Sequence, residues 1–154
     1  MQKTKSKKLE VAVITSGNHP LPKYATAQSA GLDLYADLKT DQLAILPMER
    51  VLIPTGLKMA LPDGLEGQIR PRSGLAYKKG LTVLNSVGTI DSDYTGEIKV
   101  MLINLSNDIQ TIEKGERVAQ MVLANVTRLD NWVIVEKLPE TERNNGGFGS
   151  TGEM

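Results

Sequence analysis

The sequence predicts an all-β fold, a sandwich, barrel or jelly roll, with one short helix. Short apolar or alternating runs recur along the 154 residues, and turn-forming residues separate them at 62–64 (PDG), 92–96 (SDYTG) and 114–116 (KGE). No segment of about ten or more residues keeps a helical period of apolar positions. We therefore expect many short strands and a single short helix near 75–80 (LAYKKG).

The strands are expected at the apolar runs, because each run is short and is bounded by polar, glycine or proline positions. The clearest is 97–104, where Ile98, Val100 and Leu102 face one side of the strand and the intervening residues face the other. No period of about 20 to 50 residues recurs, which argues against a propeller or a solenoid. In chain order the expected strands are 11–14, 32–36, 43–46, 51–53, 57–61, 81–84, 97–104, 109–112, 117–126 and 132–135.

Composition indicates one globular domain. The chain is 40% hydrophobic and 23% charged, which suits a single core. Residues 1–8 contain four lysines, and the apolar run after them is about four residues long, shorter than the ~7 to 15 of a signal peptide. We therefore expect 1–8 to be a flexible, solvated basic tail. Such tails are more often solubilising than contacts for nucleic acid or lipid.

Charge and cysteine content exclude several classes of function. The 18 Lys and Arg residues balance the 18 Asp and Glu residues, so no global field attracts nucleic acid or an anionic membrane, and neither is expected as a direct partner. Any anionic ligand must be held by a local site. The chain has no cysteine, which excludes a disulfide scaffold, a thiolate nucleophile and a cysteine-ligated metal. A reducing, cytoplasmic location is the expectation.

Two of five unusual stretches carry charge in or beside strands. In SAGLDLYA (29–36), Asp33 lies between two leucines, and on this evidence alone a solvent-facing acid is the favoured interpretation. In IRPRSGLAYKKG (69–80), Arg72, Ser73 and Gly74 follow a proline and precede the expected helix. A guanidinium, a hydroxyl and free backbone N–H groups suit an anion such as phosphate. Ser-Gly before a helix is also an ordinary cap.

The third stretch, 82–100, predicts a β-hairpin. Asp91 and Tyr94 lie beside its bend, and Asn85 precedes Asp91 by six positions. Unpaired backbone donors and acceptors at the open end of such a hairpin could bind the edge of a base. Asp93, and Asp91 as well, are also ordinary turn formers.

The last two stretches are a strand and the C-terminus. Gln120 occupies an alternating strand within 114–122, where a lone glutamine is usually a surface residue. Phe148 is the one phenylalanine of the chain and is surrounded by glycines, with Arg143, Ser150 and Thr151 nearby. Glycines allow the backbone to move, and hydroxyls with a guanidinium suit phosphate, so this end could serve as a lid. A disordered tail is the alternative.

Taken together, the five stretches resemble the motifs of the homotrimeric dUTPases (dUTP diphosphatases), over about residues 9–152. The arginine of the last motif is followed by Asn144, where the family usually has glycine. The motifs read AGLDLYA (30–36), PRSGLA (71–76), N-x-x-G-x-I-D-x-x-Y-x-G (85–96), GERVAQ (115–120) and RNNGGFGSTG (143–152).

The resemblance implies a distorted jelly-roll or β-barrel subunit that assembles as a homotrimer with active sites at the subunit interfaces. Residues 9–138 would form the jelly roll, and 139–154 a flexible arm that closes over the site of a neighbouring subunit. In the family the aromatic ring of this arm stacks on uracil, which implies that role for Phe148. The arm residues implied to bind substrate are Arg143, Phe148, Gly149, Ser150 and Thr151.

The implied reaction is hydrolysis of dUTP to dUMP and pyrophosphate, which limits uracil in DNA and supplies dUMP for thymidylate synthesis. Asp91 would position and deprotonate the water that attacks the α-phosphorus and would hold the 3'-hydroxyl. Mg²⁺ would be chelated mainly by the three phosphates, with Asp33 reaching it through water. The residues implied to bind the phosphates are Arg72, Ser73, Gly74 and Gln120.

The hairpin is implied to select the nucleotide. Backbone groups of 85–99 and the Asn85 side chain would reject cytosine, because its donor and acceptor are reversed relative to uracil. Tyr94, packed against the deoxyribose, would leave no room for a 2'-hydroxyl. The same wall would include Thr89, Ile90 and Lys99.

Three alternatives stay open. A dCTP deaminase shares the fold but needs a glutamate general base in its pocket and would not be expected to carry the GGFGSTG arm. A catalytically idle dUTP-binding regulator would act through partner proteins. A structural jelly roll would bind no ligand.

Overall fold

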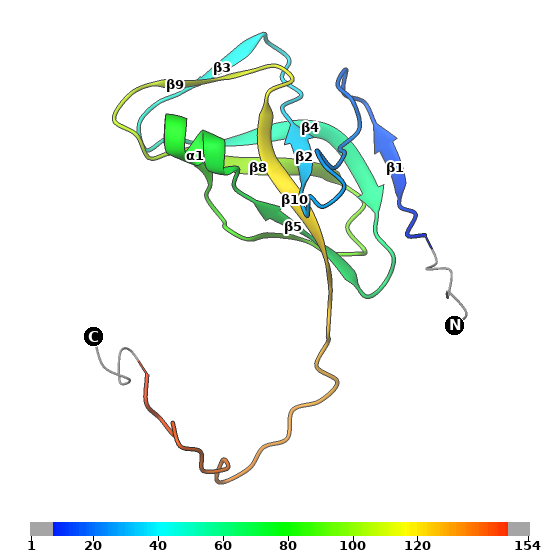
Figure 1. The fold of residues 1–154 in the computed structure, drawn as a ribbon, viewed down its shortest axis with the longest axis vertical. Coiled ribbons are helices and arrows are strands. Elements are labelled where there is room, and N and C mark those ends of the chain that lie inside the picture. The colour runs from blue at the N-terminus through cyan, green and yellow to red at the C-terminus, as the bar shows by residue number, and fades with distance from the viewer. Residues whose placement is uncertain (1–7, 148–154) are drawn as a thin grey trace.

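The computed structural model describes residues 8–147, and its strands form two four-stranded sheets and one separate strand pair (Figure 1). The predictions for Phe148, Gly149, Ser150 and Thr151 lie outside the described residues. Within 8–147 there is one helix, and no helix is long and apolar enough to cross a membrane. In chain order the elements are β1 (Ala12–Thr15), β2 (Leu32–Tyr35), β3 (Gln42–Ile45), β4 (Arg50–Ala60), β5 (Leu65–Arg70), α1 (Ser73–Lys79), β6 (Leu81–Val83), β7 (Gly88–Ile90), β8 (Glu97–Asn104), β9 (Gln110–Glu113) and β10 (Arg117–Asn125).

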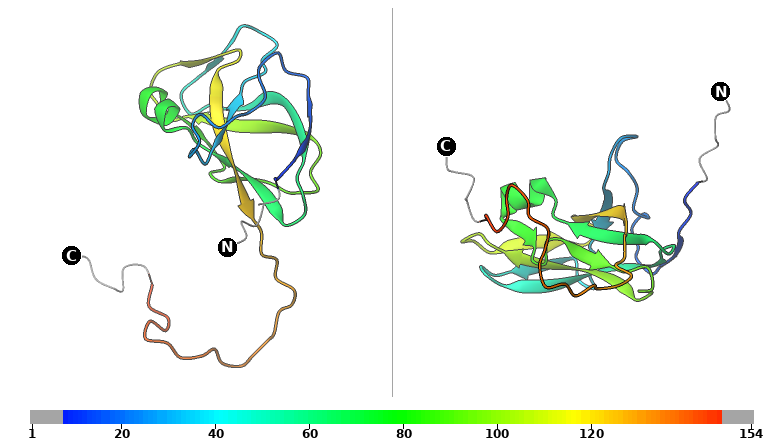
Figure 2. Two further views of the ribbon diagram at one scale, coloured as in Figure 1. Left: turned by 45° about the vertical axis from the view of Figure 1, so that its right-hand side comes forward. Right: turned by 90° about the horizontal axis from the view of Figure 1, so that it is seen from below.

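The two larger sheets enclose the core. One has the order β1-β4-β8-β6 and the other the order β2-β10-β5-β7, and every pairing in them is antiparallel. Apolar side chains of both sheets belong to one buried cluster, so the sheets share a core, as in a sandwich or jelly roll. The sheets of the described chain stay open and do not close into a barrel (Figure 2).

β8 confirms the alternation read from the sequence. Ile98, Val100 and Leu102 are fully buried, while Lys99 on the other face is exposed. β8 pairs with β4 on one side and β6 on the other, so its apolar face lies at the centre of the sheet. A central strand of this kind needs one apolar face and tolerates polar residues on the other.

The helix begins earlier than expected. α1 starts at Ser73, directly after Arg72, which is extended and makes no side-chain cap. It ends at Gly80, whose φ of 65° lies in the left-handed region that glycine adopts without strain. Lys79 Nζ donates to the backbone O of Thr111 and to Glu116 Oε1, each at 2.8 Å. These bonds tie the end of α1 to β9 and to the turn before β10.

Several strands differ from the prediction. The runs 51–53 and 57–61 belong to one long strand, β4, whose pairing with β8 is interrupted between Pro54 and Lys58. β5 was not among the strands expected. The β-hairpin predicted within 82–100 is wrong: β7 pairs with β5, and β8 pairs with β4 and β6, so the strands on either side of 92–96 belong to different sheets. Local alternation and a turn do not fix which strand becomes the partner, and here the chain crosses from one sheet to the other. The prediction of a strand at 132–135 is wrong. Trp132 is 84% and Ile134 98% exposed, and among the described residues no strand pairs with this run.

The segment after β10 leaves the body of the subunit. Both views show the chain running outward from the end of β10 (Figures 1 and 2). An apolar run becomes a strand when a neighbouring strand pairs with it and its side chains are buried. Among the described residues of this one chain, no strand pairs with the run 132–135, and its side chains are not buried.

Leu102→Ala should lower the free energy of unfolding by about 2 to 5 kcal/mol, because Leu102 is fully buried in the core. Leu105→Ala is the matched control: Leu105 is 57% exposed just after β8, so its loss should stay below about 1 kcal/mol. Chemical denaturation at one chain concentration measures both variants. Equal losses would contradict this assignment of the core.

Candidate active site

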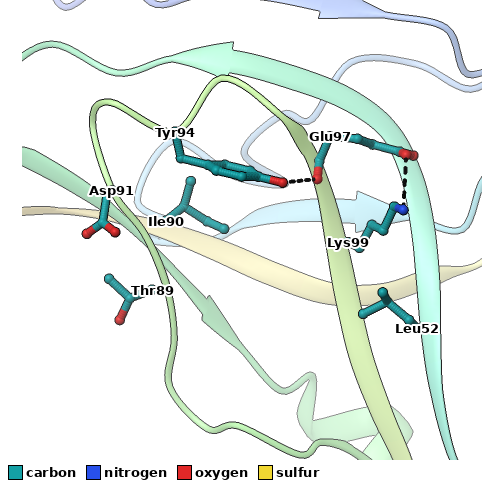
Figure 3. A pocket seen from close by; sticks show the side chains of 7 residues that line it. All are labelled: Leu52, Thr89, Ile90, Asp91, Tyr94, Glu97 and Lys99. Carbon is teal, nitrogen blue, oxygen red and sulfur yellow. Dashed lines mark hydrogen bonds and ion pairs between the residues drawn. The ribbon is translucent and has the colours of Figure 1, made fainter.

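A first cavity, named the hairpin pocket after the hairpin predicted for 82–100, lies between β7 with the 91–96 connection and the paired strands β4 and β8, and has a volume of about 470 Å³ (Figure 3). Strand alternation sorts its residues: Thr89 and Asp91 lie on one side of the backbone, and Ile90 points to the other side, toward Tyr94. The residues that line the hairpin pocket are Leu52, Thr89, Ile90, Asp91, Tyr94, Glu97 and Lys99.

The Tyr94 side chain extends from the connection between β7 and β8 toward Glu97 (Figure 3). Its hydroxyl donates to the backbone O of Glu97 at 2.9 Å, and its backbone N–H donates to the O of Asp91 at 3.2 Å. Gly96 makes this possible, because a Cβ there would lie 2.6 Å from the Tyr94 hydroxyl. The glycine of the hairpin motif therefore has a packing reason that the sequence analysis did not identify.

Charged groups at the pocket differ in their partners. Glu97 accepts from the N–H of Gly56 at 2.9 Å and lies 3.9 Å from Lys99 Nζ. The Asp91 side chain is exposed, and among the described residues no hydrogen bond or ion pair to its carboxylate is found. The carboxylate of Asp91 is thus available at the rim of the pocket.

Asn85 lies in the connection between β6 and β7. Its Nδ2 would be 3.2 Å from a Cβ at Gly88, so the side chain packs against that glycine. Asn85 is exposed and is not among the residues that line the hairpin pocket. A contact between its amide and a base stays a prediction.

A second cavity, the arginine pocket, has a volume of about 330 Å³ and lies where β2, β10 and the start of α1 meet. It brings together all five residues predicted from the strand and helix stretches, Asp33, Arg72, Ser73, Gly74 and Gln120, and it adds Arg117, which the sequence analysis missed. The signal was present, since Arg117 stands three positions before Gln120 in GERVAQ. The arginine pocket is lined by Ala25, Ser29, Ala30, Gly31, Asp33, Arg72, Ser73, Gly74, Arg117 and Gln120.

Asp33 is paired in this pocket. Its side chain is 18% exposed, Oδ1 accepts from Arg72 Nε at 2.9 Å, and Oδ2 accepts from Arg117 NH1 at 3.1 Å. The solvent-facing acid favoured from the local sequence is therefore wrong. Two guanidinium groups from distant parts of the chain replace water around this carboxylate, which no local pattern could reveal.

Gln120 is held in place by its neighbours. It pairs with Asp33 of β2 on one side and with Arg70 of β5 on the other, and its Nε2 donates to the backbone O of Pro71 at 2.9 Å. Gly31 lies directly against it, because a Cβ at Gly31 would overlap Gln120 Oε1. The surface glutamine favoured from sequence is instead an ordered part of the pocket.

The two pockets lie at opposite ends of β5 and share no residue. β5 and β7 are antiparallel, with Gly67 opposite Ile90, so Asp91 lies beside the start of β5. Ser73 follows the end of β5, seven positions after Glu66, the residue that register places opposite Asp91. At about 3.3 Å per residue this separates Asp91 from Ser73 by roughly 20 Å within one subunit.

Arg143 lies in the outward segment and lines neither pocket. Its Nε donates to the backbone O of Gly146 at 2.9 Å. Asn144 beside it has a φ of 44°, in the left-handed region where asparagine is, after glycine, among the most tolerated residues. Asparagine can therefore adopt a conformation at 144 that a glycine would adopt freely.

Comparison with known proteins identifies the family. Residues 17–152 match the family model described as dUTPase. The chain belongs to the dUTPase family. The deoxyuridine 5'-triphosphate nucleotidohydrolase of Wolbachia pipientis subsp. Culex pipiens (strain wPip) is 55% identical over 155 residues, 99% of each chain. Its counterpart in Finegoldia magna is 51% identical over 144 residues, covering 94% of this chain and 99% of the relative.

Solved dUTPase structures share the fold. The dUTPase from Streptococcus mutans is 34% identical, with a TM-score of 0.69 over 79% of this chain and 98% of that one. The Staphylococcus bacteriophage 80alpha dUTPase with dUpNHpp is 24% identical, with a TM-score of 0.81 over 94% of this chain and 99% of that one. The expected dUTPase-like, jelly-roll-type subunit is thereby confirmed.

Gly31→Ala should lower the affinity for dUpNHpp about tenfold while the protein stays folded. The new methyl group would displace the end of a flexible side chain, Gln120, from its bond to Pro71 O, and losing one such bond costs on the order of 1 kcal/mol. Calorimetric titration with dUpNHpp measures the affinity of both proteins. The control is the same change in a Gln120→Ala background, where it should have little further effect. An equal loss there would show that Gly31 does not act through Gln120.

Proposed function

We propose that the protein hydrolyses dUTP to dUMP and pyrophosphate by attack of water on the α-phosphorus. The observation that carries this function is the 55% identity to a deoxyuridine 5'-triphosphate nucleotidohydrolase over 99% of the chain. The proposal is supported by two pockets, a concave one beside the β7–β8 connection and a separate one rich in anion-binding groups. A cytoplasmic location, without a direct nucleic-acid or membrane partner, is part of the proposal and accords with the balanced charge and the absence of cysteine.

The hairpin pocket is proposed to bind deoxyuridine. Uracil presents an N–H donor beside a carbonyl acceptor, and backbone groups of 85–99 with the Asn85 side chain are proposed to pair with both. Cytosine reverses this pattern and would leave buried polar groups unpaired. Tyr94, held flat by its bond to Glu97 O, is proposed to pack against the sugar and exclude a 2'-hydroxyl. The walls are proposed to be Thr89, Ile90 and Lys99.

Asp91 is proposed to position and deprotonate the attacking water and to hold the 3'-hydroxyl. Its exposed carboxylate at the rim of the pocket can accept both hydrogen bonds. A carboxylate is a weak base at neutral pH, so most of the acceleration must come from positioning and from charge stabilisation of the phosphates. The groups proposed to supply that stabilisation are Arg72, Ser73, Gly74 and Gln120.

Mg²⁺ is proposed as the cofactor. Among residues 8–147 no group of three or more His, Cys, Asp or Glu side chains could hold a metal ion. Asp33 offers one carboxylate whose oxygens each accept from a single guanidinium, which leaves lone pairs for water. This donor set fits a hard ion that takes most ligands from phosphates and water and reaches Asp33 through a water molecule. The ion would neutralise charge on the phosphates.

A homotrimer is proposed, because one subunit does not hold a complete site. Asp91 and Ser73 lie roughly 20 Å apart along β5, too far for both to contact one α-phosphate group. The hairpin pocket of one copy and the arginine pocket of another would have to meet. A closed ring of three identical chains, in which each chain contributes both halves to different sites, satisfies this requirement.

The outward segment supports the same assembly. Its exposed side chains include Trp132, Val133, Ile134 and Leu138, a density of apolar groups that is typical of an interface. An apolar groove of about 230 Å³ beside β1 and β10 remains open on the subunit surface. We infer that the segment packs against another copy of the chain. The groove of that copy is apolar, like the exposed side chains of the segment.

The C-terminal arm, 139–154, is proposed to close over the site of a neighbouring subunit. Arg143, Ser150 and Thr151 would bind phosphates, and Gly149 would let the backbone approach them. Phe148 would stack on uracil, which gives the single phenylalanine of the chain an apolar partner. Support comes from the motif itself and from the position of Arg143, which reaches neither pocket of its own subunit.

Asp91→Asn should reduce turnover of dUTP by at least a thousandfold and leave dUpNHpp binding within about threefold, because the amide keeps the shape but cannot accept a proton. Pyrophosphate release with Mg²⁺ measures turnover, and ammonia release from dCTP tests the deaminase alternative. Asp93→Asn, in the same turn but outside the hairpin pocket, is the matched control. A near-normal rate in Asp91→Asn would refute its role as the base.

Mixing two inactive variants tests whether a site draws on two chains. Asp91→Asn and Arg72→Gln subunits, unfolded together and refolded, should regain about a quarter of the unmodified activity, since one site in four would combine the intact half of each chain. Each variant refolded alone is the control. Activity that stays at the level of the two controls would place both residues in one chain and contradict the shared site.

A further inference from the structure

We propose that Arg117 is a positioning residue of the arginine pocket: together with Asp33 it holds the guanidinium of Arg72 and gives the pocket its positive charge. The inference rests on the proposed function, because it concerns the site that would bind the substrate phosphates. The Arg117 side chain is half exposed and lies outside the apolar core, and among the described residues the hydrogen-bond partner of its guanidinium is Asp33.

A β-bulge aims Arg117 into the pocket. In a regular strand, residues three apart point to opposite faces, so Arg117 and Gln120 would diverge. The pairing of β10 with β2 is irregular here: Arg117 lies opposite Tyr35 and Ala119 opposite Leu34, so two steps on β10 match one step on β2. The extra residue brings Arg117 onto the face that Gln120 shares with Asp33, as bulges beside functional sites often do.

The same contacts orient Arg72. Its Nε donates to Asp33 Oδ1 at 2.9 Å and its NH1 donates to the backbone O of Arg117 at 3.2 Å. Two of its five N–H groups are thus used, and the others remain available to a ligand in the pocket. Arg117 NH1 binds the second oxygen of Asp33 at 3.1 Å, so the carboxylate is fixed from both sides.

Arg117 also sets the net charge of the arginine pocket. The charged residues that line the pocket are Asp33, Arg72 and Arg117, two positive groups and one negative. With Arg117 the pocket carries one net positive charge, and without it Asp33 cancels Arg72. A neutral pocket would attract a polyphosphate far less than a positive one, and the attraction that remained would respond less to salt.

The experiment measures ligand affinity by calorimetry with the full chain, using dUpNHpp, inorganic tripolyphosphate and deoxyuridine at several salt concentrations. Arg117→Gln should weaken dUpNHpp and tripolyphosphate binding about ten- to a hundredfold, because Asp33 loses the charge-assisted bond that fixes it beside Arg72 and the pocket loses its net charge, and should flatten the salt dependence. Deoxyuridine, which has no phosphate, should bind unchanged. Arg117→Lys should restore the salt dependence and part of the affinity, because lysine keeps the charge but not the planar fork.

Two controls separate positioning from a general loss of structure. Arg128→Gln removes an exposed ion pair of similar length, 2.9 Å between Arg128, just after β10, and Asp63, in the turn between β4 and β5, and should change none of the three affinities. In an Arg72→Gln background, Arg117→Gln should cost clearly less than in the unmodified chain, because the residue it positions is gone. Steady-state kinetics should show a raised KM for dUTP in Arg117→Gln.

Several outcomes would overturn the inference. These are an unchanged affinity for tripolyphosphate in Arg117→Gln, an equal loss for deoxyuridine, an equal loss in Arg128→Gln, or full additivity with Arg72→Gln. Failure of the proposed function is distinguishable, because it would appear as no pyrophosphate release from dUTP by the unmodified protein. Tripolyphosphate binding that depends on Arg117 would support the positioning role even then.

Discussion

The antiparallel pairing of β5 with β7 is the constraint on which the rest of this protein depends. β5 lies between β10 and β7, so its direction and register are fixed on both sides by backbone hydrogen bonds. Its start carries the hairpin pocket and its end leads through Pro71 into Arg72 and α1. A strand that is bonded on both edges cannot bend to bring its ends together, so its length sets the distance between the two pockets.

If the proposed site uses both pockets, that distance requires two copies of the chain to meet. Each chain contains both the proposed nucleoside pocket and the proposed phosphate pocket, but the two lie too far apart to act on one ligand there. In such an arrangement every copy would contribute its nucleoside pocket to one site and its phosphate pocket to another. A closed symmetric ring allows this and leaves no pocket without a partner. The exposed apolar run around Trp132 is consistent with such an assembly, since its burial would contribute the hydrophobic stabilisation that one subunit lacks.

Within each pocket, small residues and irregular pairing place the polar groups. Gly96 leaves the space that Tyr94 crosses, and Gly31 leaves the space in which Gln120 lies. The bulge before Ala119 turns a second guanidinium toward Asp33. None of these features contributes much to the stability of the core. Each feature orients a side chain of the proposed site. Together they explain glycines and residue spacings in the motifs that the pattern of hydrophobic residues does not explain.

Local sequence pattern was a sound guide where the local environment decides the structure. The alternation of 97–104 predicted the buried face of β8, because a central strand requires it. The short helix near 75–80 was expected, but its start at Ser73 was not, because no capping side chain marks that start: Arg72, the residue before it, makes no side-chain cap. The hairpin within 82–100 was predicted wrongly, because β7 and β8 take partners in different sheets and the local pattern does not contain those partners.

The sequence by itself determined the family, the all-β class and the chemical types of the groups in the two pockets, because these follow from residue identity and spacing along the chain. The tertiary structure alone decided that Asp33 is enclosed by two guanidinium groups, that Arg117 belongs with Gln120, and that Asp91 and Ser73 stand at opposite ends of one strand. Each of these depends on contacts between residues far apart in sequence, and such contacts are set by strand register and packing, which no local pattern contains.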